Sequence, residues 1–340
     1  MKVFLPFQSK GVGFLGVTTF AKKFQAGMEA KGHEVFFEYR PDYDVLMMIV
    51  QAPFVYLREA KHRHIPIVQR LDGVFYWTTS RFMFPLLNLK ATLIRHCFTD
   101  FTIYQSQFSQ YSSNTFLGKK YRDPSALIYN GVDLDVFTTQ GKRIDLRDNP
   151  DQKIFFTVSG FRRKDQIVPM LEALKIYKQK YGDNFKALIA GPFKENVAFI
   201  PGQYRDFKNV QFLGKIENTD LPTYERSADV FLFTHLNPPC PNNIIESLAC
   251  GLPVCGVADG AMPELIQPGK NGLLIEARGN GFWKARKLNL EAFADNLHQI
   301  VQNQSAYAQA SRQLAKEKLS LEYMVDQYVS ALEKAVENQS

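Results

Sequence analysis

Short apolar runs alternate with longer amphipathic stretches along the chain, and this alternation constrains the fold more than any other feature. The first apolar run is VFLPF at 3–7, and a helical stretch from Val17 to Lys31 follows it. Further apolar runs occur at 34–39, 45–50, 65–70 and 101–106. Because buried strands that alternate with helices form βαβ units, the first part of the chain predicts a parallel sheet.

A polar stretch at 141–153 interrupts the pattern, and a second series of the same kind follows it. Its apolar runs lie at 154–159, 187–191, 210–214, 229–233, 253–257 and 272–276, with a helix over 166–180 and a helical tail over about 290–338. We therefore predict an α/β fold with two Rossmann-like, doubly wound parallel-sheet domains, 1–148 and 149–319. Ligands of such sheets bind outside the carboxyl ends of the strands, so two facing domains imply a cleft.

Composition excludes several classes of protein. Of the 340 residues, 45% are hydrophobic and 22% are charged, which rules out a disordered chain, a collagen and a small disulfide scaffold. The longest apolar run near the N-terminus, 45–50, is far too short to span a membrane, and no signal-peptide core precedes it. We expect a cytoplasmic protein whose four cysteines are small buried thiols, with no zinc site.

A glycine-rich loop follows the first predicted strand. Gly11, Gly13 and Gly16 form G-x-G-x-x-G in KGVGFLG, where backbone N–H groups at a helix N-terminus can approach a ligand closely. Glu34 and Glu38 stand about where a dinucleotide-binding domain has its ribose acid, so a dehydrogenase is one alternative. A loop that only needs flexible backbone angles is the other.

The second series begins with TVSGFRRKD at 157–165. Here a strand ends, Gly160 turns the chain, and Arg162, Arg163 and Lys164 stand before a helix. Three cations beside a helix N-terminus suit a diphosphate, because arginine offers a planar fork and lysine a point charge. An exposed basic turn is the alternative.

The stretch 235–266 is the most informative one. Asn242 and Asn243 precede a short helix whose N-terminus can bind phosphate oxygens, and Glu246 lies one turn into that helix. A carboxylate there can accept both hydroxyls of a ribose. The turn after the next strand, at Gly260 and Ala261, offers further backbone donors. An ordinary βαβ unit with a buried polar residue is the alternative.

These segments resemble the nucleotide-sugar half-site of family-4 glycosyltransferases, which have the GT-B fold. The resemblance is carried by PCPN, ESLACGLPV, DGAMPELI and GKNGLLI, and GHEV, RLDG, YQSQFS and YNGVDLDVF stand in the family's order before them. It covers about residues 1–335. It also implies that the final helix, 320–338, packs back on the first domain.

The resemblance implies a role for each matching residue. Lys164 and Arg162 would stabilise the departing diphosphate, Arg163 would help to bind it, and Glu246 would bind the ribose as the second acid of an E-x7-E motif. The first acid is replaced by Pro238, with Asn237 and the backbone around Cys240 as the nearest substitutes. The further donor-binding positions it implies are Gly13, Gly160, Ile216, Asn242, Asn243, Ile244, Gly260 and Ala261.

In the first domain the resemblance points to Asp72, at the end of a predicted strand, as a catalytic residue near the sugar and acceptor. A loop aspartate that is satisfied locally is the alternative. The family is retaining and metal-independent, so we expect no cofactor and no metal. DLD at 133–135 spells a metal-binding D-x-D but falls in the interdomain segment, and we discount it.

The N-terminal half carries most of the positive charge, with 19 Lys and Arg against 13 Asp and Glu in residues 1–150. Within it, 74–98 is aromatic and apolar with cations spaced along it, and KHRH and KKYR lie nearby. This pattern suits an anionic membrane surface or a lipid-linked acceptor. A core helix with a solvated charged face is the alternative. Since no nucleic-acid module appears, we expect no nucleic-acid partner.

We therefore predict an enzyme that transfers a sugar from a UDP-, GDP- or ADP-sugar to a saccharide or lipid-linked glycan with retention of configuration. Polysaccharide biosynthesis is the expected context, in the cytoplasm and peripherally on the inner membrane face. Two alternatives stay open. One is a sugar-nucleotide epimerase or hydrolase of the same fold, and the other is a non-catalytic member that binds nucleotide sugar without transferring it.

Overall fold

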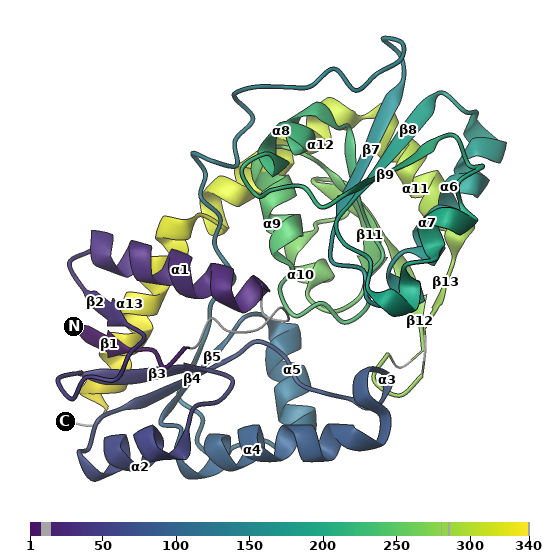
Figure 1. Cartoon of the computed structure of the whole chain (residues 1–340). Coiled ribbons are helices and arrows are strands. Elements are labelled where there is room, and N and C mark those ends of the chain that lie inside the picture. The colour runs from purple at the N-terminus through teal and green to yellow at the C-terminus, as the bar shows by residue number, and fades with distance from the viewer. Residues whose placement is uncertain (8–14, 280, 285, 339–340) are drawn as a thin grey trace. The chain divides into compact units, whose positions relative to one another are not determined.

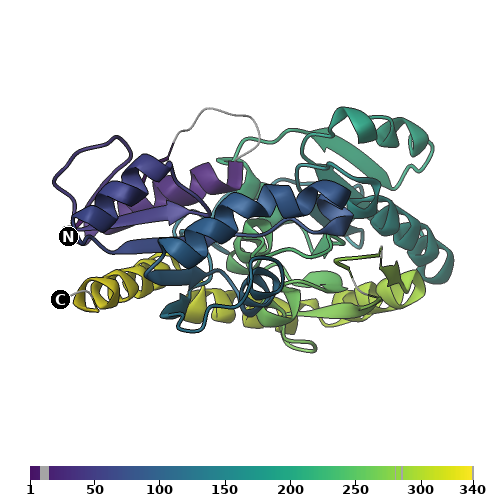
Figure 2. The same cartoon turned by 90° about the horizontal axis from the view of Figure 1, so that it is seen from below.

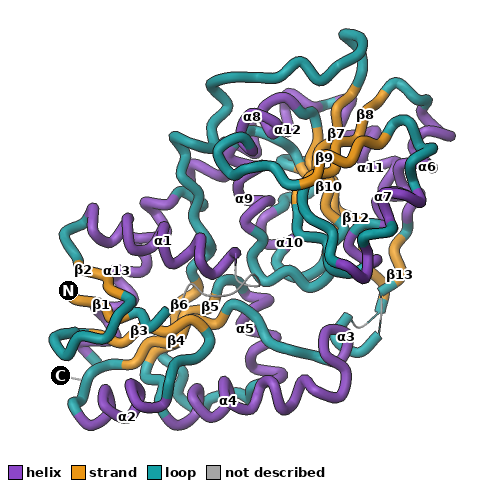
Figure 3. The backbone as a smooth tube through the Cα atoms, in the orientation of Figure 1, coloured by secondary structure: helices purple, strands orange, loops and turns teal. Residues whose placement is uncertain are grey.

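The computed structural model describes residues 1–7, 15–279, 281–284 and 286–338. By its internal contacts the chain divides into two compact units, each with its own sheet. Unit 1 comprises 1–131, 282–284 and the chain from 319 onward, and unit 2 comprises 132–281 and 285–318. Orange strands flanked by purple helices mark the same layered α/β arrangement in each unit (Figure 3).

Unit 1 has a parallel sheet in the order β2-β1-β3-β4-β5-β6. Its strands are β1 (Lys2–Phe4), β2 (Glu34–Phe36), β3 (Val45–Ile49), β4 (Ile67–Leu71), β5 (Phe101–Tyr104) and β6 (Ser125–Leu127). Its helices are α1 (Leu15–Ala30), α2 (Phe54–His62), α3 (Trp77–Ser80), the 3-10 turn η1 (Arg81–Met83), α4 (Phe84–Cys97), α5 (Gln107–Phe116) and α13 (Leu321–Glu337).

Both faces of the unit 1 sheet are covered, so its strands read as continuous apolar runs rather than alternating ones. Val45 and Met47 of β3 join the core under α1 and α13, whereas Leu46 and Met48 join the core under α2 and α4. Figure 1 shows α1 and α13 on one face of this sheet and α2 and α4 on the other. The final helix, which follows all of unit 2 in sequence, is therefore a core element of unit 1.

Unit 2 has the sheet order β13-β12-β11-β10-β7-β8-β9, parallel except for β13. Its strands are β7 (Lys153–Val158), β8 (Phe185–Ala190), β9 (Val210–Gly214), β10 (Val230–Phe233), β11 (Val254–Ala258), β12 (Gly272–Arg278) and β13 (Lys287–Leu288). Its helices are η2 (Lys164–Gln166), α6 (Val168–Tyr181), η3 (Glu195–Val197), α7 (Ile200–Gln203), α8 (Leu221–Ser227), α9 (Asn242–Ala249), α10 (Met262–Leu265), α11 (Leu290–Gln302) and α12 (Gln304–Lys318).

Adjacent residues of β7 show how unit 2 is layered. Phe155 packs edge-on against Tyr177 of α6, and Phe156 stacks on Tyr224 of α8. Helices α6 and α11 therefore cover one face of the sheet, and α8 and α9 cover the other. All parallel strands end at one edge, which is where the predicted site residues of this unit lie.

The boundary between the units corrects the predicted one. The sequence placed it between 148 and 149, but residues 132–148 belong to unit 2. Side chains of unit 2 hold this polar segment by its backbone: Arg226 Nε donates to Lys142 O (3.1 Å), Ser227 Oγ accepts from Ile144 N (2.8 Å), and Arg312 Nη1 donates to Phe137 O (2.8 Å). A stretch poor in apolar residues is thus packed against unit 2 through hydrogen bonds.

Candidate functional site

The strand order of unit 2 places a topological switch point between β7 and β10. From β7 the chain moves to β8 and β9 on one side, and from β10 it moves to β11 and β12 on the other. Connections that leave in opposite directions open a crevice at the carboxyl ends of the two strands, where open α/β sheets bind their ligands. The loops that border this point are 159–166 after β7 and 234–241 after β10.

Gln166 fixes the loop after β7 and ties it to the loop after β10. Its Oε1 accepts hydrogen bonds from the backbone N–H groups of Arg162 (2.7 Å) and Arg163 (3.1 Å). Its backbone carbonyl accepts from Thr234 Oγ1 (2.9 Å). The sequence analysis did not single out Gln166, although its place directly after RRKD was a usable signal.

The three predicted cations of this loop differ in their surroundings. Arg162 is exposed, and its guanidinium has no partner among the residues with described placement. Lys164 Nζ stands 4.9 Å from the centroid of the Phe199 ring. Arg163 is paired with Asp165 through Nε (3.0 Å) and Nη2 (2.8 Å), so its charge is already balanced. Two cations rather than three are thus available to an anion.

The helix α9 is held at the switch point by Asn243. Its Nδ2 donates to Val158 O at the end of β7 (2.8 Å), and its Oδ1 accepts from Ile244 N (3.0 Å). Ile244 itself is fully buried and anchors the helix in the core. The first turn of α9, including Asn242, therefore lies beside the loop 159–166 and directs the positive end of its dipole there.

Glu246 is half-buried one turn into α9, beside Glu225 of α8. Glu225 is buried, and burial raises the pKa of its carboxyl group well above the ordinary value, with the charge of Glu246 acting in the same direction. Glu225 therefore retains its proton more readily than an exposed glutamate. This neighbour could not be foreseen, because Glu225 lies on a different helix.

The segment around Pro238 packs tightly on the turn after β11. Gly260 has φ +59°, and a Cβ there would lie 2.4 Å from Pro238, so only glycine fits. Ala261 N donates to Pro238 O (2.8 Å), and Gly260 N donates to Asp259 Oδ1 (2.9 Å). Both N–H groups therefore have acceptors within the protein, Gly260 N on the Asp259 side chain and Ala261 N on the Pro238 carbonyl, and the donor-binding role of Gly260 and Ala261 stays a prediction.

Asp259 is the centre of a polar cluster that the sequence analysis missed. Its carboxylate accepts from Asn237 N (3.0 Å) and forms an ion pair with Arg286 Nη2 (2.8 Å). Burial raises its pKa, and Arg286 opposes this shift. Asn237, the nearest substitute for the missing first acid, has φ +55° and donates from Nδ2 to Gly281 O (3.1 Å). Because Arg286 is distant from Asp259 in the sequence, no local motif predicts the cluster.

His235 lies in the loop after β10, beside Gln166 of the loop after β7. Its ring stacks on Phe233, with centroids 4.8 Å apart, and its Nδ1 is 3.4 Å from Gln166 Nε2. Burial, and after it the charge of Arg163, lowers the pKa of His235 to about 4. The imidazole is therefore neutral near pH 7 and can accept from Gln166. Its position after a strand was the signal that could have identified it.

The remaining predicted residues are more dispersed. Ile216 follows β9, the edge strand, two strands away from β7. At Gly160 a Cβ would meet no atom within 4 Å. Gly13 lies outside the described residues.

Asp72 follows β4 in unit 1, where it forms an ion pair with the fully buried Arg70. Burial raises the pKa of Asp72, whereas Arg70 and a hydrogen bond with Gln105 act against that shift. This geometry matches the alternative of a loop aspartate satisfied by its neighbours.

The described residues also exclude two features. None of the helices among them is long and apolar enough to cross a bilayer. Nor do they contain a cluster of three or more His, Cys, Asp or Glu side chains placed to hold a metal ion.

Two glycosyltransferases align with part of the chain. D-inositol 3-phosphate glycosyltransferase of Mycobacterium sp. (strain KMS) is 27% identical over 169 residues, 47% of this chain and 38% of that protein. Chitobiosyldiphosphodolichol beta-mannosyltransferase of Mus musculus is 28% identical over 118 residues, 32% of this chain and 24% of that protein. The chain thus spans well under half the length of these relatives.

Solved structures match over nearly the whole length. Anabaena HepE, solved in complex with UDP, has a TM-score of 0.72 at 18% identity and covers 98% of this chain and 99% of its own. Sucrose-phosphate synthase of Thermosynechococcus elongatus has a TM-score of 0.77 at 14% identity, with 100% and 99% covered. These likenesses confirm the predicted fold class, two doubly wound parallel-sheet domains of the GT-B type.

The family assignment comes from the chain's own residues 139–317. They match the model of the glycosyl transferases group 1, and this segment spans more than half of the chain. It includes the loop 159–166, the helix α9 with Glu246 and the turn at Gly260, which are the features that border the switch point of unit 2. The chain belongs to the glycosyl transferases group 1 family.

Proposed function

We propose that this protein transfers a sugar from a nucleotide-sugar donor to a saccharide or lipid-linked glycan, with retention of configuration at the anomeric carbon. The observation that carries the proposal is the pair of cations, Arg162 and Lys164, beside the first turn of α9 at the switch point of unit 2. Membership of the family supports the class of reaction. The UDP bound to Anabaena HepE makes UDP-sugars the first donors to test, before GDP- and ADP-sugars.

In this proposal each residue at the switch point has a role set by its charge. Arg162 and Lys164 bind the diphosphate together with the amide groups of the first turn of α9, and Arg163 positions the loop through Asp165. Glu246 accepts hydrogen bonds from the two ribose hydroxyls. Gly160 and the backbone at Ile216 line the remainder of the donor, and the role of Gly13, which lies outside the described residues, stays a prediction. No metal is required, because the cations and the helix dipole balance the charge of the diphosphate.

The proposed reaction needs positioning and charge stabilisation rather than a protein nucleophile. The acceptor hydroxyl attacks the anomeric carbon on the face from which the diphosphate leaves. The bond between the acceptor oxygen and the anomeric carbon forms as the bond between that carbon and the phosphate oxygen breaks. A phosphate oxygen of the leaving diphosphate takes the proton of the hydroxyl group. Arg162 and Lys164 stabilise the negative charge that develops on the diphosphate.

Pro238 favours a second candidate, a member that binds nucleotide sugar without transferring it. It replaces the acid expected at that position, and its carbonyl is occupied by Ala261 N. In the first candidate Asn237 supplies the polar contact to the transferred sugar. An epimerase or hydrolase of the same fold is a further outcome, which would form product from donor without any acceptor.

Unit 1 is the proposed acceptor-binding unit, and an anionic membrane surface is its proposed partner. The basic and apolar stretch 74–98 supports both proposals. A polysaccharide or glycolipid pathway at the cytoplasmic membrane face is the corresponding setting.

The decisive experiment measures nucleotide binding by calorimetry with UDP, GDP and ADP. Arg162→Ala, Lys164→Ala and Glu246→Ala should each weaken binding by about 10- to 100-fold, the loss of one or two charge-assisted hydrogen bonds. Arg143→Ala is the matched control, because Arg143 is also exposed in unit 2 but precedes β7, away from its carboxyl end. If Arg162→Ala and Lys164→Ala both bind nucleotide as tightly as the parent, the proposed diphosphate site is wrong.

Turnover then separates the candidates. Product that appears only with an added saccharide or lipid-linked acceptor supports transfer, and product without acceptor indicates an epimerase or hydrolase. Nucleotide binding without turnover on any acceptor identifies the non-catalytic member.

A further inference from the structure

The helix α4 of unit 1 exposes leucines on its outer face and buries two polar side chains beside Ala91 and Ile94. The residues it buries include Asn88 and Arg95, whereas Leu86, Leu89 and Leu93 are 63%, 50% and 45% exposed. A surface helix of a globular protein normally turns its apolar stripe inward and its polar face to water. An outward stripe of leucines therefore requires an explanation other than core packing.

Asn88 and Arg95 fix the rotation of α4 about its own axis. Asn88 bonds both backbone groups of Phe75, donating from Nδ2 to the carbonyl (2.8 Å) and accepting at Oδ1 from the N–H (3.0 Å). Two buried polar side chains with bonded partners could not be turned to the outside without losing those bonds. The leucines consequently cannot rotate inward.

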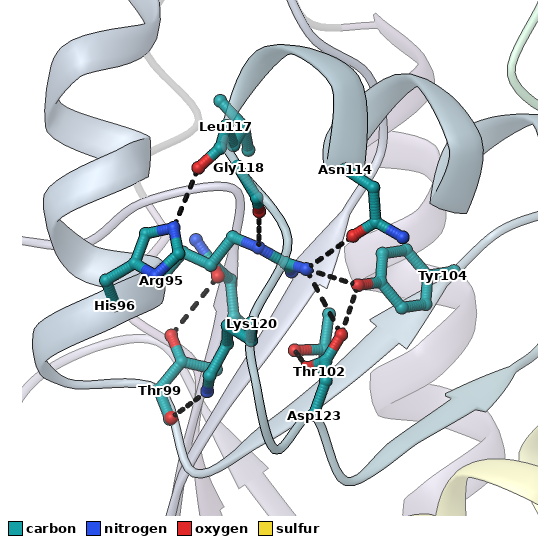
Figure 4. A network of polar contacts seen from close by, with 11 residues as sticks. Arg95, His96, Thr99, Thr102, Tyr104, Asn114, Leu117, Gly118, Lys120 and Asp123 are labelled. Atoms are coloured by element: carbon teal, nitrogen blue, oxygen red, sulfur yellow. Dashed lines mark hydrogen bonds and ion pairs between the residues drawn. The ribbon is translucent and has the colours of Figure 1, made fainter.

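Arg95 forms the larger of the two anchors, which Figure 4 shows in detail. Its guanidinium donates to the hydroxyl of Tyr104 (2.7 Å), Asn114 Oδ1 (2.9 Å), Asp123 Oδ2 (3.1 Å) and the carbonyl of Gly118 (3.2 Å). These partners come from β5, α5 and the segment that leads to β6. The network therefore ties α4 to the sheet and keeps its opposite face in solvent.

The 3-10 turn η1 extends the outward apolar stripe. Phe82 is 79% exposed and lies four residues before Leu86. We name the whole surface the α4 face, and it consists of Phe82, Met83, Leu86, Leu87, Leu89 and Leu93, all of them exposed. A contiguous apolar surface of this kind marks an interaction site.

The charged residues in the segment that carries the α4 face are all positive. No aspartate or glutamate occurs between Gly73 and Thr99, whereas Arg81 is exposed and Lys90 stands over the ring of Phe54 at 5.6 Å. This last contact brings α2 alongside α4, and Figure 2, seen from below, shows the two helices on the same side of unit 1.

The neighbouring helix α2 adds an exposed row that contains one arginine. Val55, Arg58 and His62 are exposed at a spacing of three and four residues, which places them on one face of the helix. Arg58 has no acidic partner within the described ranges, and the nearby Glu59 is bound to Tyr39 and Arg63. Helices with leucine and phenylalanine on the outside and arginine and lysine at the borders bind in the plane of an anionic bilayer.

We propose that the α4 face inserts into the headgroup region of an anionic membrane, with α2 alongside it and Arg58, Arg81 and Lys90 binding the lipid phosphates. A second copy of the chain fits less well, because face-to-face docking would bring two identical sets of these cations together. The inference deepens the proposed membrane partner of unit 1, and it does not depend on sugar transfer at unit 2.

The experiment uses the full chain and sedimentation with two kinds of vesicle, phosphatidylcholine alone and phosphatidylcholine with phosphatidylglycerol in equal parts. Binding should rise with the anionic lipid and fall with added salt, since the headgroup contacts are screened. The double variant Leu86→Ser with Leu93→Ser should bind the anionic vesicles about tenfold more weakly. Tyr323→Ser on α13 is the matched control, an exposed ring on the opposite face of the sheet, and should bind like the parent.

The two tryptophans give a second readout without labelling. Trp77 contacts Phe82, with ring centroids 4.7 Å apart, and Trp283 contacts Phe84 at 5.7 Å. Emission should shift to shorter wavelength on anionic vesicles and be quenched by lipids with brominated chains. The variants leave unit 2 unchanged. Nucleotide binding measured in the same samples therefore tests the proposed nucleotide site of unit 2 independently of membrane binding.

Three results would overturn the proposal. The first is equal or absent binding of the parent to both kinds of vesicle, and the second is parent-like binding by the double variant. The third is a parent that sediments as a dimer in solution and a double variant that is a monomer, which would assign the α4 face to a second copy of the chain.

Discussion

The arginines of unit 1 and the basic loop of unit 2 use the same chemistry in opposite ways. Arg70 and Arg95 are fully buried, and their guanidinium groups are bound to hydroxyl, amide and carboxylate groups of unit 1. Arg162 and Lys164 of unit 2 are exposed at the carboxyl ends of strands. A buried cation whose partners are internal stabilises the fold, whereas an exposed cation at a switch point remains available to a ligand.

The same contrast applies to Asp72, whose catalytic role stays a prediction. Arg70 donates from Nε to the hydroxyl of Tyr328 and from Nη2 to Asn130 Oδ1, both at 2.8 Å, and Nη1 is left to pair with Asp72. Asp72 thus completes the bonding of a structural arginine. The sequence shows an acid at the end of a strand but does not show which cation lies beside it.

The largest expected effect comes from exchanging one arginine of each kind for methionine. Arg95→Met should lower the free energy of unfolding by about 3–5 kcal/mol, because it leaves Asp123 and Asn114 without their buried partner. Arg162→Met should change it by less than about 0.5 kcal/mol. Urea unfolding followed by circular dichroism measures both. Equal losses of unfolding free energy in the two variants would contradict the proposed difference between the arginines of the two units.

A pH titration of stability tests the neutral imidazole in unit 2. The unfolded chain binds a proton on His235 below its ordinary pKa of 6.5, whereas the folded chain resists protonation until about pH 4. Stability is therefore lost as the pH falls between these values, by about 3 kcal/mol in all. His235→Gln should lose less stability than the parent over this range. Parallel curves for parent and variant would show that His235 is protonated freely in the folded state.

The smallest effects come from two matched helix caps, one in each unit. Ser320 caps α13 by accepting from Tyr323 N (3.0 Å), and Asn289 caps α11 by accepting from Ala292 N (3.1 Å). Replacing either by alanine should cost about 1 kcal/mol. If the units unfold separately, scanning calorimetry will show Ser320→Ala shifting one transition and Asn289→Ala the other. A single transition that both variants shift would show that the two units unfold as one cooperative structure.

Much of the fold could be predicted because most of its strands are buried on both faces, although the edge strand β9 is not. The apolar run at 210–214 coincides with β9, and most other runs differ from the strands by one to three residues. The short strands β6 and β13 were missed, since SAL and KL carry no apolar run. The boundary was misplaced because hydrogen bonds from Arg226 and Arg312, far along the chain, decide where residues 132–148 pack.

The candidate site was predictable where its residues are neighbours in sequence. The loop with Arg162 and Lys164, and α9 with Glu246, follow strands that could be recognised. The partners that modify these groups come from elsewhere: Glu225 from another helix, Arg286 from a later loop, and Ala261 N from the turn that occupies the carbonyl of Pro238. A single sequence carries no signal for such pairs.

The place of α13 in unit 1 has a consequence for synthesis on the ribosome. Tyr328 packs against Phe20 and Phe24 of α1 and binds Arg70, so the packing of α1 must wait until α13 has been made. Unit 2, whose residues end at 318, is complete before α13 leaves the exit tunnel. Unit 2 can therefore fold before unit 1, although most of unit 1 is made first, and α1 stays exposed to chaperones and proteases until α13 is made.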